Sequence, residues 1–202
     1  MSSPEAEPAF RRLDVDIRRA QLLETGARLF TESGYDGVSM SEVAAAAGIS
    51  KGLLYHYFPG KREFFAATLE AAAAELRAVT RTDPDQPPLE QLGAAVDAYL
   101  RWIDDHADSY VRLLQSAGAL SDVASLVERM RDETAQRIVA GLAGDDEPPP
   151  ALSAAVHGWL WFMDGACLQW LQSGREPPRA ELRDMLVAVL AAAATAAAAP
   201  RA

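Results

Sequence analysis

Apolar residues recur along almost the whole chain at the three- and four-residue spacings that place side chains on one face of an α-helix. Gly and Pro interrupt these stripes, as at Gly34, at Pro59 and Gly60, and over residues 174–178. No alternating apolar and polar run bounded by turn residues predicts a strand. We therefore expect an all-α protein, and 202 residues allow one or two domains with a sizeable core.

Residues 39–61 predict two short helices joined by a tight turn. Ser39 and Glu42 have the spacing of a capping box, which opens a helix, and Ser50 is placed to cap the next helix. Gly48 lies between them and can adopt the left-handed conformation that a turn of three or four residues requires. This is the layout of a helix-turn-helix, whose second helix enters the major groove of DNA.

The second of these helices carries side chains suited to a DNA duplex. The chain has only two lysines, Lys51 on this helix and Lys61 at the start of the next one. Each offers a cation to a phosphate, and Lys51 also to a guanine edge. Gly52 lets the backbone approach the duplex, and the aromatic residues 55–57 (Tyr-His-Tyr) combine polar tips with flat apolar bodies.

Residues 18–65, which read RRAQLLETGARLFTESGYDGVSMSEVAAAAGISKGLLYHYFPGKREFF, resemble the DNA-binding domain of the TetR family of transcriptional regulators. In that family the first three helices bind DNA and the fourth links them to a regulatory domain. The residues that match the family's usual DNA contacts are Ser39, Met40, Ser50, Lys51, Gly52, Tyr55, His56, Tyr57 and Lys61. Met40 stands where the family more often has a hydroxyl or small residue.

The resemblance also implies a division of the chain. We expect a flexible arm over residues 1–15, a helix-turn-helix domain over residues 16–62 and a helical ligand-binding and dimerisation domain over residues 63–202. Within the last part, residues 83–88 (DPDQPP) predict a loop, and further helices are expected at about 89–106, 109–117, 122–142, 151–173 and 179–199.

The function that the resemblance implies is that of a sequence-specific regulator, a repressor released from its operator by a small molecule. Its partners would be a pseudo-palindromic DNA duplex, a second copy of the chain and a largely apolar effector. No enzyme activity, cofactor or metal is expected. Cys167, the one cysteine, excludes an internal disulfide, and the N-terminus lacks the pattern of a signal peptide, so we expect a cytoplasmic protein without a membrane span.

Aromatic residues and a few polar groups in the C-terminal part are candidates for an effector pocket. The candidates are Tyr99, Trp102, Tyr110, Leu114, Trp161, Met163 and Asp164. Residues 156–171 are apolar on nearly every side, so this helix must be covered on more than one side, and its own core together with a partner subunit would cover it. By resemblance, the last two helices pair with their symmetry mates, with candidate contacts at Trp159, Met163, Trp170, Leu182, Met185, Leu186 and Val189.

Two other classes of function compete with this interpretation. Residues 48–52 (GISKG) match the G-x-S-x-G pattern of an α/β-hydrolase nucleophile, with His106 or His157 as a nominal base, but that motif needs a preceding strand. The other alternative is a helical interaction module that has lost DNA binding. His157 and Asp164, seven residues apart, predict a polar pair on one helix face rather than a metal site.

The net charge of −10 and the pI near 4.8 argue at first against a nucleic-acid partner. The distribution of the charge removes most of that objection. Residues 1–65 carry 8 Lys and Arg against 9 Asp and Glu, whereas residues 66–202 carry 11 against 20. Residues 49–62 contain three basic residues and no acidic one, which predicts a small basic reading face on an otherwise acidic molecule.

Overall fold

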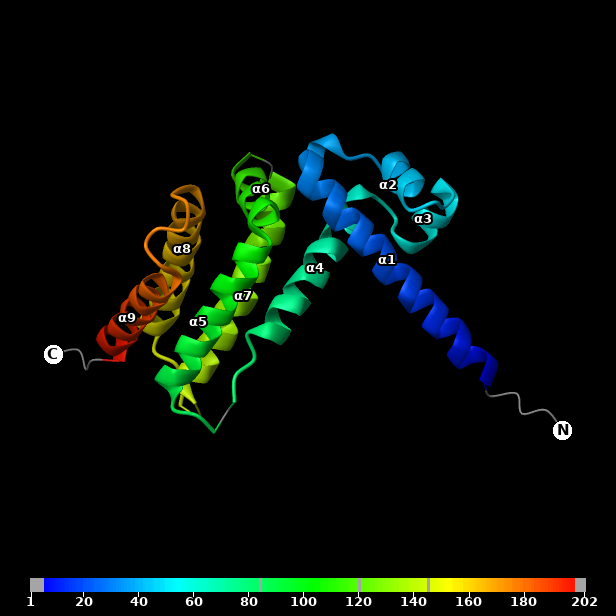
Figure 1. The fold of residues 1–202 in the computed structure, drawn as a ribbon. Coiled ribbons are helices and arrows are strands. Elements are labelled where there is room, and N and C mark those ends of the chain that lie inside the picture. Colours follow the sequence, from blue (N-terminus) through cyan, green and yellow to red (C-terminus); the bar gives the residue numbers. More distant parts are fainter. Residues whose placement is uncertain (1–5, 84, 120, 145, 199–202) are drawn as a thin grey trace. The chain divides into compact units, whose positions relative to one another are not determined.

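The computed structural model describes residues 6–83, 85–119, 121–144 and 146–198, and these contain nine α-helices and no strand (Figure 1). The all-α prediction is therefore confirmed. The helices are α1 (Ala6–Gly37), α2 (Met40–Ala46), α3 (Lys51–Tyr57), α4 (Lys61–Val79), α5 (Pro88–Asp105), α6 (Ala107–Ala119), α7 (Ser121–Ala143), α8 (Pro150–Gln172) and α9 (Arg179–Ala198). No helix among the described residues is long and apolar enough to cross a membrane.

The chain divides into two compact units, Met1–Ala74 and Glu75–Ala202. The division falls inside α4, so one continuous helix contributes to both units. The sequence had suggested a division between residues 62 and 63, at the N-terminal end of this same helix. We call Met1–Ala74 the N-terminal unit and Glu75–Ala202 the C-terminal unit.

The first helix is longer than the sequence pattern predicted. It begins at Ala6, within residues 1–15 that the sequence assigned to a flexible arm, and residues 1–5 of that arm lie outside the described residues. Pro8 does not prevent this early start, because a proline in the first helical turn removes an N–H that has no intrahelical partner. Gly34 interrupts the helix with a φ of 70°, at the position where the sequence predicted a helix end.

An aromatic cluster holds α1 and α4 together in the N-terminal unit. The ring of Phe30 lies 4.7 Å from that of Phe65 and 5.8 Å from that of Phe64, centroid to centroid. Gly26 permits this close approach, because a Cβ atom at that position would lie only 2.5 Å from Cζ of Phe64. The buried seam of α2 and α3, which includes Val43 and Leu54, completes this core.

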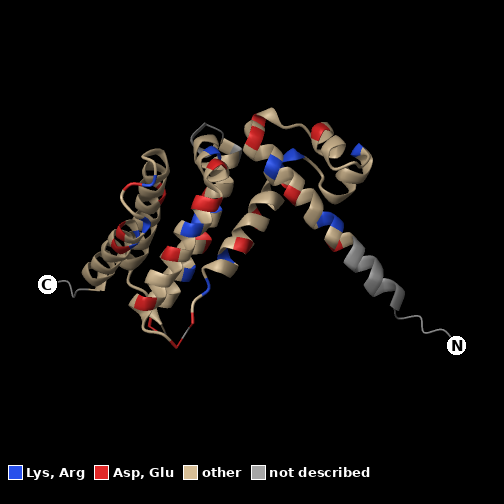
Figure 2. Ribbon diagram, viewed as in Figure 1, with Lys and Arg blue, Asp and Glu red and all other residues tan. Residues whose placement is uncertain are grey.

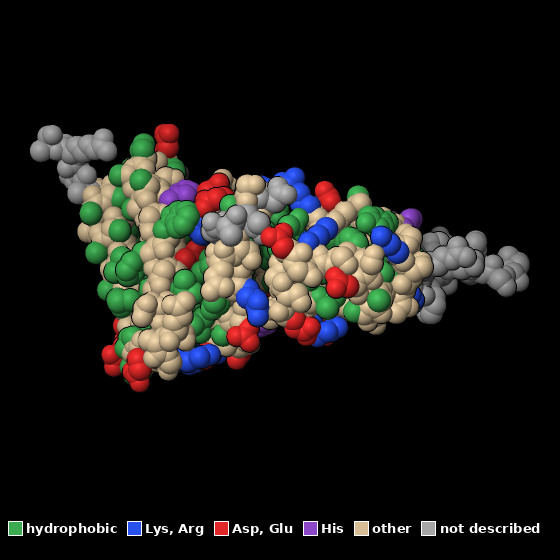
Figure 3. All heavy atoms as spheres, turned by 90° about the horizontal axis from the view of Figure 1, so that it is seen from above, with side chains coloured by type: hydrophobic (Ala, Val, Ile, Leu, Met, Phe, Trp, Pro, Cys, Tyr) green, Lys and Arg blue, Asp and Glu red, His purple; other side chains and the backbone are tan. Residues whose placement is uncertain are grey.

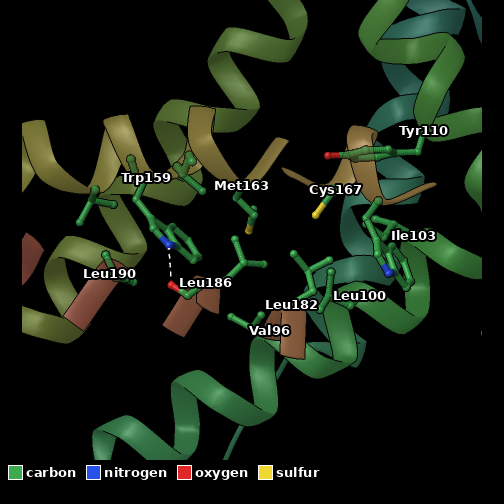
Figure 4. Close-up of a cluster of buried hydrophobic side chains, with 14 of the residues drawn as sticks. Val96, Leu100, Ile103, Tyr110, Trp159, Met163, Cys167, Leu182, Leu186 and Leu190 are labelled. Carbon is green, nitrogen blue, oxygen red and sulfur yellow. Dashed lines mark hydrogen bonds between the residues drawn. The ribbon is translucent and has the colours of Figure 1, made fainter. Parts of the chain in front are cut away.

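The C-terminal unit has its own core, in which α8 packs against α7 and α9, and α9 packs against α5. Two buried tryptophans of α8 satisfy their indole N–H groups inside this core. Trp159 donates to the backbone oxygen of Leu186 at 2.9 Å (Figure 4), and Trp170 donates to that of Pro177 at 2.8 Å. These bonds fix which face of α8 points inward.

Candidate functional site

The helices α2 and α3 and the turn between them form the helix-turn-helix that the sequence predicted. Ser39 and Glu42 make both hydrogen bonds of a capping box: the Ser39 N–H donates to the Glu42 carboxylate at 2.7 Å, and the Glu42 N–H donates to Ser39 Oγ at 3.2 Å. Ser50 Oγ caps α3 by accepting from the Leu53 N–H at 3.2 Å. Gly48 turns the chain between them with a φ of 66°.

The outer face of α3 presents most of the side chains that were matched to DNA contacts. Ser39, Ser50, Lys51, Gly52, Tyr55 and His56 are exposed, and Tyr57 and Lys61 are half-buried. Leu54 lies on the opposite face of α3 and is fully buried. The helix carries no acidic residue (Figure 2), so its outer face offers hydroxyl, ammonium, phenol and imidazole groups without a competing carboxylate.

Met40 does not fit the role that the sequence match gave it. Its side chain is only 6% exposed and belongs to the core of the N-terminal unit. Met40 is the first residue of α2. Its apolar side chain turns inward because removing apolar surface from water lowers the free energy. Ser39, the preceding residue, remains exposed, but its hydroxyl is engaged in the cap.

The two lysines have different surroundings. Lys51 is exposed, with its Nζ 5.9 Å from the centroid of the Tyr55 ring. Lys61 is held more firmly, because its Nζ donates to the backbone oxygen of Asp36 at 3.3 Å and lies 4.6 Å from the centroid of the Tyr35 ring. Lys61 therefore ties the start of α4 to the end of α1, and a phosphate contact would use its remaining donors.

Arg19 is a cation next to this surface that sequence reasoning did not single out. It is exposed on α1, and its guanidinium lies 5.4 Å from the centroid of the Phe58 ring, at the C-terminal end of α3. The sequence did not predict its position because Arg19 is far from α3 along the chain, and no local pattern links a residue of α1 to the recognition helix. The match to the family covered this residue without assigning it a contact.

The hydrolase interpretation is wrong. The segment before Ser50 is the helix α2 and a turn rather than a strand, and Ser50 Oγ serves as a helix cap. His106 and His157 pair instead with Glu75 at 4.0 Å and with Asp132 at 3.3 Å. His157 and Asp164, expected as a pair, each have other partners, and no metal-binding cluster occurs among the described residues.

Three of the predicted pocket residues, Tyr99, Tyr110 and Asp164, form a hydrogen-bonded network in the C-terminal unit. The Tyr99 hydroxyl donates to that of Tyr110 at 3.2 Å, and the Tyr110 hydroxyl donates to Oδ1 of Asp164 at 3.0 Å. Arg131, which the sequence did not single out, binds the other carboxylate oxygen of Asp164 through Nη2 at 2.6 Å. Its guanidinium lies 4.0 Å from the centroid of the Trp161 ring.

The other candidate pocket residues have separate surroundings. Trp102 donates to Glu75 at 3.0 Å and stacks on His106, Leu114 is half-buried, and Met163 is buried in the core. A surface depression of about 470 Å³ lies elsewhere, between α5 and α9, and its lining includes Gly93, Asp97 and Arg183.

Burial and charge together set the protonation of this network. Burial raises the pKa of Tyr99 and of Tyr110 well above the ordinary value, so both phenols keep their protons as donors. Burial, with the charge of Asp164 as a smaller cause, raises the pKa of the Cys167 thiol to about 12. Burial would lower the pKa of Arg131, but the hydrogen bonds and charges of Asp164 and Glu128 together outweigh it and raise that pKa.

The candidate dimer contacts separate into two groups. Met185 and Val189 are exposed on α9, as a contact surface requires. The other five candidates are buried inside the single chain, so the prediction that they contact a partner subunit is wrong. They are Trp159, Met163, Trp170, Leu182 and Leu186. The sequence could not separate the groups because apolar residues surround α8. In the structure Trp161 and Phe162 of α8 are exposed, and hydrophobic side chains are visible on the surface at the left of Figure 3.

Loss of the capping box should weaken α2 in a pH-dependent way. At pH 7 we expect Ser39→Ala to cost about 1 kcal/mol of local stability. The hydrogen bonds from Ser39 hold the pKa of Glu42 below its ordinary value, so the stabilisation is present above the unfolded pKa and is lost as pH falls through the lowered one. Hydrogen exchange of α2 amides should show a large difference between Ser39→Ala and the wild-type chain at pH 7 and a smaller one near pH 3. An equal difference at both pH values would contradict the role of Glu42.

The fold and this surface together define a helix-turn-helix DNA-binding protein with a second, all-helical unit. Residues 22–68 match the model of the bacterial regulatory proteins of the tetR family. Residues 88–193, more than half of the chain, match that of the tetracyclin repressor-like C-terminal domain. The chain belongs to the TetR family of transcriptional regulators, and it is therefore a regulator rather than an enzyme.

Relatives of known sequence and structure agree with this assignment. The HTH-type transcriptional regulator BetI of Burkholderia thailandensis is 36% identical over 167 residues, which are 79% of this chain and 84% of BetI. The transcriptional activator FasR of Mycolicibacterium smegmatis is 36% identical over 103 residues, 49% of this chain, and the match spans only 46% of FasR. A tetR-family regulator from Streptomyces coelicolor has a TM-score of 0.72 at 33% identity, over 90% of this chain and 83% of that one.

Proposed function

We propose that the protein is a ligand-responsive repressor that binds a pseudo-palindromic operator as a homodimer. The observation that carries the proposal is the outer face of α3, which is exposed and has no acidic residue. The caps at Ser39 and Ser50 stabilise α2 and α3, and the inner side of α3 packs in the core. A regulator of this family acts on duplex DNA, so its place of action is the cytoplasm. Since FasR is named an activator, the sign of regulation is a separate outcome, which a reporter gene placed behind the operator measures.

The contacts to DNA are assigned by chemistry and exposure. Lys51 and Tyr55 lie together on the outer face of α3 and offer a cation and a phenol to base edges and phosphates. His56 is also exposed on this helix, and Arg19 adds a guanidinium near its C-terminal end. Phosphate contacts set the register of the protein on the duplex, and the few base contacts of α3 set the sequence that is read.

The exposed apolar residues of α8 and α9 supply the surface for a second copy. Trp161, Phe162, Met185 and Val189 lie on these helices with large exposed fractions, and we call them the apolar face. A two-fold dimer presents two copies of α3 and so matches an operator whose half-sites lie about 34–36 Å apart, one helical turn of DNA. The effector would act in the C-terminal unit by favouring a dimer whose α3 helices no longer fit both half-sites.

Removing either Lys51 or Tyr55 should strongly weaken specific operator binding while leaving the dimer folded. We expect Lys51→Ala and Tyr55→Ala each to weaken operator binding by about 10- to 100-fold, because a good base or phosphate contact contributes about 1–3 kcal/mol. The probe is a duplex that the wild-type chain selects from a random library, with a scrambled duplex as competitor, in a mobility-shift titration.

Arg28→Ala is the matched control for the loss of one positive charge, since Arg28 is exposed on α1 and paired with Glu32 at 3.5 Å. It should bind like wild type. A steep loss of affinity with rising salt is expected from phosphate neutralisation. Wild-type affinity in both α3 variants, or no selected duplex at all, would favour the helical interaction module instead.

A further inference from the structure

Arg131 lies between the buried hydrogen-bonded network of the C-terminal unit and the apolar face. Its side chain comes from α7 and is only 8% exposed. One side of the guanidinium binds Asp164 at 2.6 Å, and its plane lies 4.0 Å from the centroid of the Trp161 ring. Glu128, one turn earlier on α7, accepts from its Nη1. Arg131 therefore touches both the buried network and the apolar face.

On the inner side, the position of Arg131 depends on a chain of hydrogen bonds. Both oxygens of the Asp164 carboxylate are engaged, one by Arg131 and one by Tyr110, whose own oxygen accepts from Tyr99. These residues come from α5, α6, α7 and α8, so the network spans four helices. Loss of the Tyr110 hydroxyl would free one carboxylate oxygen and allow the carboxylate and the guanidinium to shift together.

On the outer side, the Trp161 ring rests on the guanidinium while 59% of the residue stays exposed. The stacked guanidinium therefore sets how the ring is presented on the apolar face, next to Phe162 on α8.

We propose that the Arg131–Trp161 contact couples dimerisation to the Tyr99–Tyr110–Asp164–Arg131 network. The inference rests on the proposed function, in which a second copy covers the apolar face. Covering Trp161 removes water from the exposed ring that lies over the buried guanidinium. This lowers the local dielectric and strengthens the contacts of the guanidinium with the ring and with Asp164. Because such coupling is reciprocal, a closed network in turn favours the dimer. Arg131 is thus a positioning residue: it is buried beneath the apolar face and acts on the dimer through the Trp161 ring.

A double-mutant cycle on the full chain tests this coupling. Tyr110→Phe removes one hydroxyl, keeps the ring and lies off the apolar face, so it should not affect dimerisation directly. We expect it to raise the dimer Kd about fivefold in the wild-type background and to have little effect in a Trp161→Leu background. Sedimentation of labelled chain with fluorescence detection measures the Kd, and far-UV circular dichroism checks that each variant is folded.

Met185→Ala is the control, because Met185 belongs to the apolar face but lies on α9, whereas Trp161 lies on α8. It should weaken the dimer, and its effect should add to that of Tyr110→Phe. Tyr99→Phe, one hydrogen bond further from Asp164, should give a smaller rise in Kd and replaces Tyr110→Phe if that variant fails to fold.

The outcomes separate the two proposals. If Met185→Ala weakens the dimer but Tyr110→Phe does not, or if Tyr110→Phe acts equally with and without Trp161, the coupling is overturned while the dimer stands. If Met185→Ala and Trp161→Leu leave the Kd unchanged, or the wild-type chain is a monomer, the proposed dimer face itself is wrong.

Discussion

Replacing Val189 with Asp should convert the protein into a monomer and with it remove operator binding. Val189 lies on α9 one turn after Met185, and both are exposed apolar residues of the face assigned to the second copy. In a two-fold dimer the substitution places two carboxylates in a surface that excludes water, where each loses hydration and gains no partner. We expect the dimer Kd to rise at least about 100-fold, since unpaired or like charges at an interface cost several kcal/mol.

The matched control is Val79→Asp, the same substitution at another exposed valine, at the end of α4. It should leave both the Kd and the operator affinity close to wild type. Sedimentation and the mobility-shift assay are run on the same samples. A dimeric Val189→Asp chain that still binds the operator would place the interface elsewhere on the molecule.

The second large effect is expected on stability, from Arg131→Met. The substitution keeps the length and the apolar stem of the side chain but leaves the Asp164 carboxylate, which is mostly buried, without its cation. Removing one partner of such a pair costs about 3 kcal/mol or more, because the remaining charge is neither hydrated nor neutralised. All four tryptophans lie in the C-terminal unit, so urea unfolding followed by tryptophan fluorescence reports on this unit alone.

A compensating substitution distinguishes loss of a charge pair from loss of packing. In the double variant Arg131→Met with Asp164→Asn, an uncharged amide oxygen still accepts from Tyr110 and no unpaired charge remains. We expect this variant to regain most of the lost free energy of unfolding, to within about 1 kcal/mol of wild type. A double variant as unstable as the sum of the two single variants would show that packing around Arg131, and not its charge, is what matters.

The N-terminal unit was predictable because its signals are local. The capping box of Ser39 and Glu42, the cap at Ser50 and the left-handed turn at Gly48 each depend on residues within a few positions of one another. Those signals fixed α2 and α3 and placed Lys51 and Tyr55 on an exposed helix. The prediction of a DNA contact at Met40 was wrong because a family pattern specifies only a position in the sequence. The direction of the Met40 side chain depends on the local core, in which it is buried.

The C-terminal unit was less predictable because its important contacts join distant parts of the chain. Arg131 pairs with Asp164 across 33 residues, and no spacing rule separates such an arginine from the solvated arginines on the same helix. The inward face of α8 could not be predicted either. In a helix that is apolar on nearly every side, the sequence does not distinguish Trp159 from Trp161. Only the packing of α9, through the bond from Trp159 to Leu186, separates the core tryptophan from the exposed one.

Helix α4 belongs to both units at once. It runs from Lys61 to Val79 without a Gly or Pro, and the division between the units falls within it, after Ala74. The backbone hydrogen bonds of an α-helix join each residue to the fourth one before it, so those near Ala74 cross this division. A proline placed there would remove one of these bonds and weaken residues of both units together.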